Sequence, residues 1–305
     1  MAETAYQEGA NIKVMTARSS KYVVITPVRD EEEHIRSTME SMVCQTVLPE
    51  EWLVVDDGSK DGTGKIIDEF ARQYPWIKAI HRNDRGFRKS GAGVVDAFYD
   101  GYRALTSNEW EFLIKFDGDL TFEANYFEKC LEEFAGDGNL GIGGGVICYV
   151  TEGKKSFEEA PRFHVRGATK IYRRACWEGI GGLLPAPGWD TLDEMKANSL
   201  GWSTRSFPNL HLVHQRITGA ADGLWPTLVK YGRANYICGY HPLFMISKCF
   251  VRLGRTPYVI GSVGLLYGFV SGYWLKVKRV EDRAAVEYLR HQQINKLLGR
   301  ETIWR

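Results

Sequence analysis

The sequence has almost no net charge and no paired cysteines. Over 305 residues, 39 Lys and Arg oppose 38 Asp and Glu, which gives a formal net charge of +1. A chain with so weak an overall field has no general attraction for nucleic acid, so we expect no nucleic-acid partner. No cysteine belongs to a CxxC pair or has the spacing of metal ligands, and we expect reduced thiols in a cytosolic setting. The six cysteines are Cys44, Cys130, Cys148, Cys176, Cys238 and Cys249.

Internal repeats, low-complexity segments and an apolar leader are also missing. Residues 1–20 are polar, and we expect no signal peptide there and a flexible N-terminus. The length suits one large domain, or one domain with an extension.

The first part of the chain alternates between two kinds of segment. Apolar runs that predict strands occupy 22–26, 51–57, 77–82 and 111–117, and the segments between them, 30–45, 61–74 and 91–105, predict helices. The runs are apolar on both faces, which is typical of a parallel sheet covered by helices. From about residue 140 the alternation weakens, although 190–202 still predicts a helix. The fold class is therefore α/β, with a parallel sheet flanked by helices.

Carboxylates follow two of these predicted strands directly. Asp56 and Asp57 end the run "VVDD", and Asp117 and Asp119 follow the next-but-one strand in "KFDGD". The carboxyl ends of parallel strands meet at one edge of a sheet, where ligands bind. Two carboxylates two residues apart can reach one hard cation, and oxygen ligands favour Mg²⁺ or Mn²⁺. A polar turn without a ligand is the alternative, because Asp and Gly are common turn residues.

Other readings of these motifs fit less well. A calcium loop over 117–128 would need glycine where Phe122 stands. A phosphoacceptor receiver domain would have its acidic pair after the first strand, and here the pair follows the second. A dinucleotide-binding fold would have G-x-G-x-x-G after the first strand, where this chain has "TPVRDEE".

Four motifs taken together resemble a known family. "VVITPVRDEEEHI", "WLVVDDGSKDGT", "FDGD" and "WDTLDEMKANSLGW" occur in the order seen in family 2 glycosyltransferases with the GT-A fold. The resemblance covers about Tyr22 to Arg216. It implies a nucleotide-sugar donor, a divalent cation (Mn²⁺ or Mg²⁺) and inversion at the anomeric carbon. It also implies a GT-A-like catalytic domain over 21–245, built on a mixed, mainly parallel sheet flanked by helices. The nucleotide-binding half would lie at about 21–120 and the acceptor half at about 121–245.

The same resemblance implies roles for individual residues. Asp57 would contact the nucleotide base, Asp119 would bind the metal, and Asp117 would face the ribose or the metal. His214 is a candidate metal ligand, with a structural histidine as the alternative, and Arg216 suits phosphate because its planar fork matches phosphate oxygens. The expected nucleotide-sugar contacts are Thr26, Pro27, Arg29, Asp57, Arg88, Lys89, Asp117 and Arg216, and the expected metal ligands are Asp117, Asp119 and His214.

A catalytic base is expected where the family has a Glu-Asp pair at the start of a helix. The matching stretch is "GWDTLDEMKANSLGW", in which Asp190 takes the Asp position and Trp189 replaces the Glu. Asp190 is therefore the candidate base, with Asp193 and Glu194 as alternatives. A residue at this position could instead only cap the helix.

A late uncharged segment predicts contact with a membrane. Residues 257–275 carry no charge over 19 residues, which is about the length that crosses a bilayer core. Gly264, Gly268 and Gly272 have the spacing that lets helices pack closely in lipid, and cations stand on both sides. We expect 246–305 to be a membrane-associated helical segment on the cytoplasmic face of the cell membrane, peripheral, re-entrant or single-pass, with lipid contact through about 257–298. A helix buried against the catalytic domain is the alternative.

These observations predict a metal-dependent, hexosyltransferase-type enzyme of polysaccharide biosynthesis. It would move a sugar from a nucleotide-sugar donor to a hydroxyl of a lipid-linked or cell-envelope glycan. Transfer directly to polyprenyl phosphate and a non-catalytic nucleotide-sugar-binding module are the alternatives. The sequence does not determine the donor sugar, the nucleotide base, the linkage or whether the protein forms a homo-oligomer.

Overall fold

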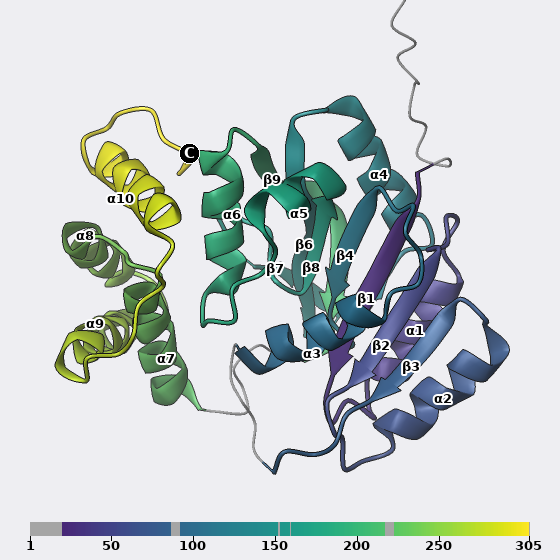
Figure 1. Ribbon diagram of the computed structural model, residues 1–305. Coiled ribbons are helices and arrows are strands. Elements are labelled where there is room, and N and C mark those ends of the chain that lie inside the picture. The colour runs from purple at the N-terminus through teal and green to yellow at the C-terminus, as the bar shows by residue number, and fades with distance from the viewer. Residues whose placement is uncertain (1–19, 87–91, 152, 159, 217–222, 305) are drawn as a thin grey trace, which may run out of the picture.

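The computed structural model describes residues 20–86, 92–151, 153–158, 160–216 and 223–304. The first half of the sheet is parallel, and its strands run side by side in the order β3-β2-β1-β4 (Figure 1). Strands β1, β2 and β4 are buried along their whole length, as their unbroken apolar runs predict. The elements of this half are β1 (Tyr22–Val28), α1 (Ile35–Val43), β2 (Glu51–Asp56), α2 (Thr63–Gln73), β3 (Ile77–His81), α3 (Ala92–Ala104) and β4 (Phe112–Phe116).

The second half extends the same sheet with mixed pairing. Strand β8 pairs antiparallel with β4, β6 pairs antiparallel with β8, and β9 pairs parallel with β6. The full order is β3-β2-β1-β4-β8-β6-β9-β5, and β7 pairs with β6. These elements are β5 (Leu120–Phe122), α4 (Tyr126–Gly136), β6 (Leu140–Thr151), β7 (Lys154–Phe157), β8 (Thr169–Arg173), α5 (Arg174–Ile180), α6 (Trp189–Ser199) and β9 (Ser203–His214). The predicted α/β class with a mixed, mainly parallel sheet is confirmed.

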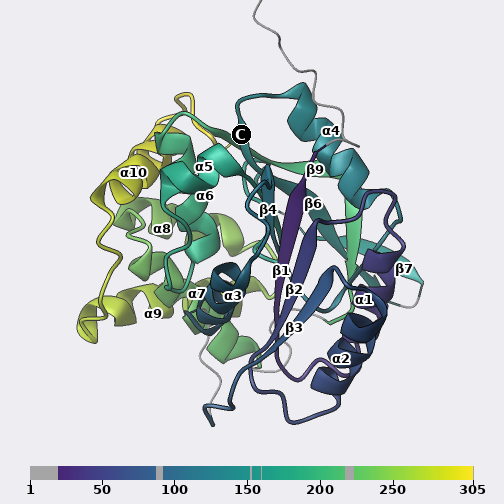
Figure 2. The same ribbon diagram turned by 45° about the vertical axis from the view of Figure 1, so that its right-hand side comes forward.

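Helices cover both faces of the sheet and create two separate cores. Val24 of β1 belongs to the cluster that α1, α2 and α4 cover, whereas its neighbours Val23 and Ile25 belong to the cluster under α3, α5 and α6. Figure 2 shows the two helical layers on opposite sides of the strands. This alternation of inward faces is the two-residue period of a strand.

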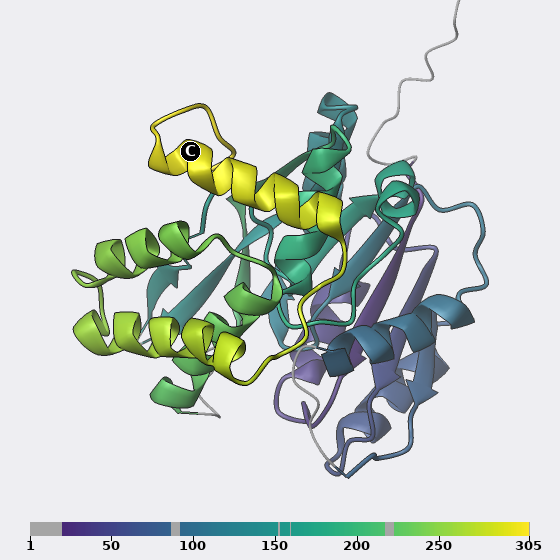
Figure 3. The ribbon, with the colours of Figure 1, turned by 60° about the vertical axis from the view of Figure 1, so that its left-hand side comes forward.

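Four further helices lie beside α6, at the opposite side of the molecule from β3 (Figures 1 and 3). They share a third apolar cluster with Leu192 and Met195 of α6. The boundary that we expected at 245/246 lies inside α8, so the helical part begins earlier in the chain than the expected extension. The helices are α7 (Leu224–Ile237), α8 (Pro242–Arg252), α9 (Tyr258–Trp274) and α10 (Arg283–Leu297).

The uncharged run forms α9, and its glycines face another helix of the same chain. A Cβ atom on Gly268 would lie 2.1 Å from the carbonyl oxygen of Val229 in α7, and one on Gly264 would lie 2.8 Å from Cβ of Leu228. The glycine spacing predicts close helix packing, and the partner in the structure is α7 of the same chain. Contact of this segment with lipid stays a prediction. Within the residues that the structure describes, no helix has both the length and the apolar character to cross a bilayer.

The close approach of α9 to α7 predicts a steric cost at Gly268. Gly268→Ala should lower the free energy of unfolding by roughly 1–3 kcal/mol, because the new methyl group meets backbone that has no room to move. Gly136→Ala, at the end of α4, is the matched control, since no atom lies within 4 Å of its added Cβ. Urea unfolding of both variants measures the difference, and equal stabilities would contradict this packing.

Candidate active site

The carboxyl ends of β1, β2 and β4 bring the predicted residues to one edge of the sheet. Val28 at the end of β1 lies opposite Asp56 at the end of β2, and β4 pairs with the other side of β1. Pro27, Arg29, Asp57, Asp117 and Asp119 therefore lie at this edge, as the sequence predicts. Thr26 is fully buried, and its Oγ1 accepts a hydrogen bond from Trp52 Nε1 at 2.8 Å. That position does not support the expected donor contact of the Thr26 side chain.

Asp57 is surrounded by arginines. Its carboxylate binds Arg82 Nη1 at 2.5 Å and Arg85 Nη2 at 2.6 Å. Arg29 joins the group because its Nη1 donates to the Asp57 carbonyl at 2.8 Å, and its Nη2 donates to Asp84 Oδ1 at 2.7 Å. Three guanidinium groups thus gather around one buried carboxylate. Arg82 and Arg85 were not among the predicted site residues, although "RNDR" directly follows β3, which ends at the same edge.

Asp119 and His214 form a second group at this edge. Antiparallel pairing of β5 with β9 places Leu120 opposite His214, and His214 Nε2 lies 2.9 Å from Asp119 Oδ2. Burial opposes ionisation of Asp119, but the hydrogen bond and charge of His214, together with Arg216, outweigh it and hold its pKa below the ordinary value. Burial likewise opposes a charged His214, and Asp119 outweighs it and raises the pKa of the imidazole. Asp117 forms an ion pair with the buried Lys115.

Glu31 is a member of this group that the sequence analysis missed. Its carboxylate pairs with Arg216, which also lies 3.7 Å from Asp119 Oδ2. Burial, and then the nearby charge of Asp119, raise the pKa of Glu31 to about 7, against the pull of Arg216. Glu31 Oε2 is buried and has no hydrogen-bond partner in the part of the chain that the structure describes. Its place in "RDEEEH", directly after the first strand, was the available signal.

The described residues contain no cluster of three or more His, Cys, Asp or Glu side chains poised to hold a metal. Asp119 and His214 can nevertheless supply two of the ligands of such a site. Two neighbouring ligands of an octahedral cation, each about 2.1 Å from it, lie about 3 Å apart. Asp119 Oδ2 and His214 Nε2 lie 2.9 Å apart in a direct hydrogen bond, which a bound ion would replace without a large movement of either side chain. The donors present thus fit a Mg²⁺ or Mn²⁺ ion that takes its remaining ligands from a substrate.

Asp190, the candidate base, lies in the first turn of α6 and is half-buried. The helix cap is Gly188, so the alternative of a purely capping role is not seen. Burial opposes ionisation of Asp190, but the positive charges of His164, Lys170 and Arg166 hold its pKa below the ordinary value. Asp190 is therefore ionised near neutral pH and can accept a proton.

The carboxylates of the other two candidate bases, Asp193 and Glu194, accept hydrogen bonds from buried groups of the same chain. Lys170 Nζ donates to Asp193 Oδ1 at 2.7 Å and to Glu194 Oε1 at 2.9 Å. Asp193 also accepts from the Tyr172 hydroxyl at 2.5 Å, and Glu194 accepts from the backbone N–H of Val165 at 2.7 Å. Burial raises the pKa of Asp193 to about 6, although Lys170 opposes this shift. These buried partners assign Asp193 and Glu194 to holding α6 in place.

Residues 166–170 link the edge of the sheet near Asp119 with the helix that carries Asp190. The Asp117 backbone N–H donates to the Ala168 carbonyl at 2.9 Å, and a Cβ atom on Gly167 would lie 3.3 Å from Asp190 Cβ. Arg166 of this segment is one of the positive charges that offset burial and lower the pKa of Asp190, and it forms an ion pair with Glu158 at 2.8 Å. One polar region thus joins this edge to Asp190, and no sequence pattern indicated Arg166.

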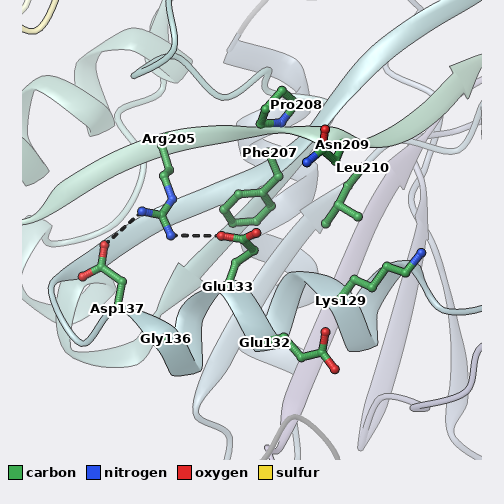
Figure 4. A pocket seen from close by; sticks show the side chains of 10 residues that line it. All are labelled: Lys129, Glu132, Glu133, Gly136, Asp137, Arg205, Phe207, Pro208, Asn209 and Leu210. Atoms are coloured by element: carbon green, nitrogen blue, oxygen red, sulfur yellow. Dashed lines mark hydrogen bonds and ion pairs between the residues drawn. The ribbon is translucent and has the colours of Figure 1, made fainter.

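Arg88 and Lys89 lie outside the described residues, so their predicted phosphate contacts stay predictions. A separate hollow lies between α4 and β9, where Arg205 bridges Glu133 at 3.0 Å and Asp137 at 3.3 Å (Figure 4). Its lining contains none of the predicted site residues, so we do not assign it to the active site.

The fold and this edge define a GT-A-like α/β domain, and comparison with known proteins identifies its family. The family model described as "Glycosyl transferase family 2" matches residues 23–181, which is more than half of the chain. The chain belongs to this family, as its motifs predicted, and it carries a glycosyltransferase domain.

Individual relatives are distant. The uncharacterized protein MJ0544 of Methanocaldococcus jannaschii is 30% identical over 112 residues, 36% of this chain and 45% of that protein. EpsH of Bacillus subtilis, named as a glycosyltransferase candidate, is 27% identical over 188 residues, 54% of this chain and 50% of that protein. The matches thus span about half the length of these curated relatives or less.

A solved structure supports the fold. The mannosyltransferase PcManGT from Pyrobaculum calidifontis, in complex with GDP-Man and Mn²⁺, superposes with a TM-score of 0.55 over 94% of this chain and 78% of that one. The sequence identity is 15%, so this likeness establishes the architecture alone.

The raised pKa of Glu31 predicts a pH-dependent stability. Its carboxyl has an ordinary pKa of 4.5 and a folded pKa of about 7, so the unfolded chain loses this proton first as pH rises. The free energy of unfolding should therefore fall between these two pH values, by roughly 1–3 kcal/mol, and then level off. Glu31→Gln should remove this part of the pH dependence. Denaturant unfolding with chelator present, at about pH 5 and about pH 8, measures it.

Glu132→Gln, on the exposed side of α4, is the matched control for that experiment and should keep the wild-type slope. A Glu31→Gln protein that loses as much stability as the wild type on raising the pH would show that Glu31 is already ionised.

Proposed function

We propose that this protein is a metal-dependent, inverting glycosyltransferase that moves a sugar from a nucleotide-sugar donor to a hydroxyl of a lipid-linked or cell-envelope glycan. The observation that carries this proposal is the polar region that joins the Asp119 and His214 pair to Asp190 in a family 2 domain. Such a region would bring a divalent cation and an ionised carboxylate to one donor. These are the two groups that a single displacement at an anomeric carbon needs.

The donor nucleotide would bind at Asp57 and its arginines. Asp57 can accept from a base N–H, and Arg29, Arg82 and Arg85 supply charge next to it. Binding would exchange some of the arginine contacts of Asp57 for contacts with the donor. The GDP-Man in the PcManGT complex supports a nucleotide-sugar donor in this fold.

The diphosphate would lie over Asp119, His214 and Arg216. A bound Mn²⁺ or Mg²⁺ would supply positive charge that stabilises the nucleoside diphosphate as it leaves. Asp119 and His214 would hold this ion, with Asp117 as a further ligand once released from Lys115. Arg216 offers a planar fork to phosphate oxygens, and Glu31 orients that fork. The Mn²⁺ of the PcManGT complex supports a divalent cation for this fold.

Asp190 would accept the proton of the acceptor hydroxyl. As the acceptor oxygen bonds to the anomeric carbon, the bond from that carbon to the diphosphate oxygen breaks, and the hydroxyl proton passes to the Asp190 carboxylate. The positive charges around Asp190 keep it ionised before the reaction. The Lys170 network fixes the first turn of α6, because Lys170 Nζ also donates to the Asp190 carbonyl at 2.5 Å.

The metal part of this proposal predicts that Asp119→Asn abolishes transfer. The variant keeps the shape of the side chain but removes its charge, and we expect turnover to fall by at least about a hundredfold. EDTA should inhibit the wild type, and Mn²⁺ or Mg²⁺ should restore it. A thermal-shift screen of GDP- and UDP-sugars with Mn²⁺ selects the donor first, since a ligand at 100 times its Kd stabilises by about 2.7 kcal/mol.

Asp137→Asn is the matched control, because this carboxylate also pairs with an arginine but lies at the hollow between α4 and β9. It should keep wild-type turnover. Full activity of the wild type in excess chelator would contradict the metal assignment. Absence of both transfer and donor hydrolysis in the pure wild type would favour a non-catalytic binding module.

The acceptor part predicts a large effect of Asp190→Asn. A hydroxyl acceptor must lose a proton, so removing the base should reduce kcat by about a hundredfold or more while donor binding persists. A polyprenyl phosphate acceptor is already ionised, so its transfer would lose little. Single-turnover kinetics with each acceptor class separates the two, and a mild loss with the hydroxyl acceptor would contradict the role of Asp190.

A further inference from the structure

Helices α8 and α9 expose an unusual amount of apolar surface. Ile246, Phe250 and Val251 of α8 are 45%, 68% and 65% exposed, and Val259, Val263 and Trp274 of α9 are 59%, 49% and 71% exposed. We call this surface the α8–α9 face. The two helices lie next to each other at the outer side of the molecule, away from the sheet (Figure 3). Soluble proteins rarely leave so large a patch uncovered.

The orientation of both helices is set by what they bury. In α8 the inner side carries Phe244, Met245 and Cys249, so Ile246 and Phe250 must face outward. In α9 the glycines, Leu265 and Phe269 face the protein, whereas Val259 and Val263 are exposed on another side of the helix. The exposed residues thus form two continuous helical faces and are not scattered side chains.

The segment of the chain that carries this face has charged side chains of one sign, and the first carboxylate after it, Glu281, pairs with Lys278 at 2.8 Å. Residues 224–280 contain no Asp or Glu but contain Lys230, Arg233, Lys248, Arg252, Arg255, Lys276, Lys278 and Arg279. The whole chain has a formal charge of +1, so the remainder of the chain carries −7 while this segment carries +8. Arg255 and Lys276 stand at the two ends of α9, and both are exposed. Cations next to an apolar helical face are typical of segments that bind anionic lipid.

We propose that the α8–α9 face binds the surface of a bilayer that contains anionic lipid. The two helices lie in the plane of the membrane, their apolar side chains enter the boundary between headgroups and acyl chains, and the cations contact lipid phosphates. A second copy of this chain is a poorer partner, because two such faces would bring like charges together. This proposal concerns an interaction surface and does not depend on the transfer reaction.

The proposed lipid contact differs from the range 257–298 expected from the sequence, because it includes α8 and leaves out α10. Helix α10 packs against α6 and α8 and buries Ala285, Leu289 and Gln293. Lys196 of α6 also pairs with Asp282 at the start of α10, at 3.0 Å. We therefore infer that α10 packs on the rest of the protein and does not contact lipid, and that only α8 and α9 form the lipid-binding face.

Flotation of the full chain with lipid vesicles tests the proposal. The wild type should float with vesicles of phosphatidylcholine mixed with phosphatidylglycerol, and less with phosphatidylcholine alone. After binding, high salt should release only part of the protein, because salt screens charge but not apolar insertion. Phe250→Glu combined with Val259→Glu should reduce the bound fraction by about tenfold or more. Leu48→Glu combined with Leu200→Glu is the matched control, since these side chains are 46% and 53% exposed elsewhere.

A depth measurement keeps the test independent of folding. Brominated lipid should quench tryptophan fluorescence in the wild type, and Trp274→Phe should remove most of that quenching while leaving flotation largely intact. Wild-type protein that stays unbound with both kinds of vesicle overturns the proposal. So does a face variant that floats like the wild type, or a dimer in sedimentation experiments that the Phe250→Glu and Val259→Glu changes abolish.

Discussion

The parallel ladder of β2, β1 and β4 is the constraint on which the site depends. These strands are buried on both faces, so their register is held by backbone hydrogen bonds and by two apolar cores at once. A shift of one residue would exchange the two faces of every strand. Because the register is fixed, Arg29, Asp57 and Asp117 leave the sheet at the same edge. The chemistry of the site is therefore a consequence of where three apolar runs stop.

Carboxylates at this edge are balanced by cations of the same chain. Asp57 has Arg82 and Arg85, Asp117 has Lys115, and Asp119 has His214. A buried carboxylate without such partners would be costly. A donor or a cation arriving at this edge must exchange with these internal partners, which are already arranged around the carboxylates. Glu31 differs from the others, because its raised pKa shows that Arg216 does not fully compensate its burial.

Sequence patterns predicted the strands, the edge and the carboxylates, because each depends on residues close in the chain. They missed Arg82, Arg166 and Lys170, whose roles arise from contacts between distant segments. Arg216 and Glu31, for example, are 185 residues apart. The partner of the α9 glycines was not predicted for a similar reason. Their spacing predicts a close helix–helix contact, but nothing in the spacing indicates that the partner is α7.

The third apolar cluster links the candidate base to the outer helices. It contains Leu192 and Met195 of α6 together with Leu265 and Phe269 of α9. The helix that carries Asp190 therefore shares one packed core with α9, which forms part of the α8–α9 face. Between them lies α7, which packs on the glycines of α9, and whose Ala234 carbonyl would lie 3.8 Å from a Cβ atom on Gly188, the cap of α6. A displacement of α9 therefore cannot leave α7 unchanged, because Gly268 and Val229 are already in close contact. The geometry around Asp190 and the position of the outer face are in this way set by the same helix–helix contacts.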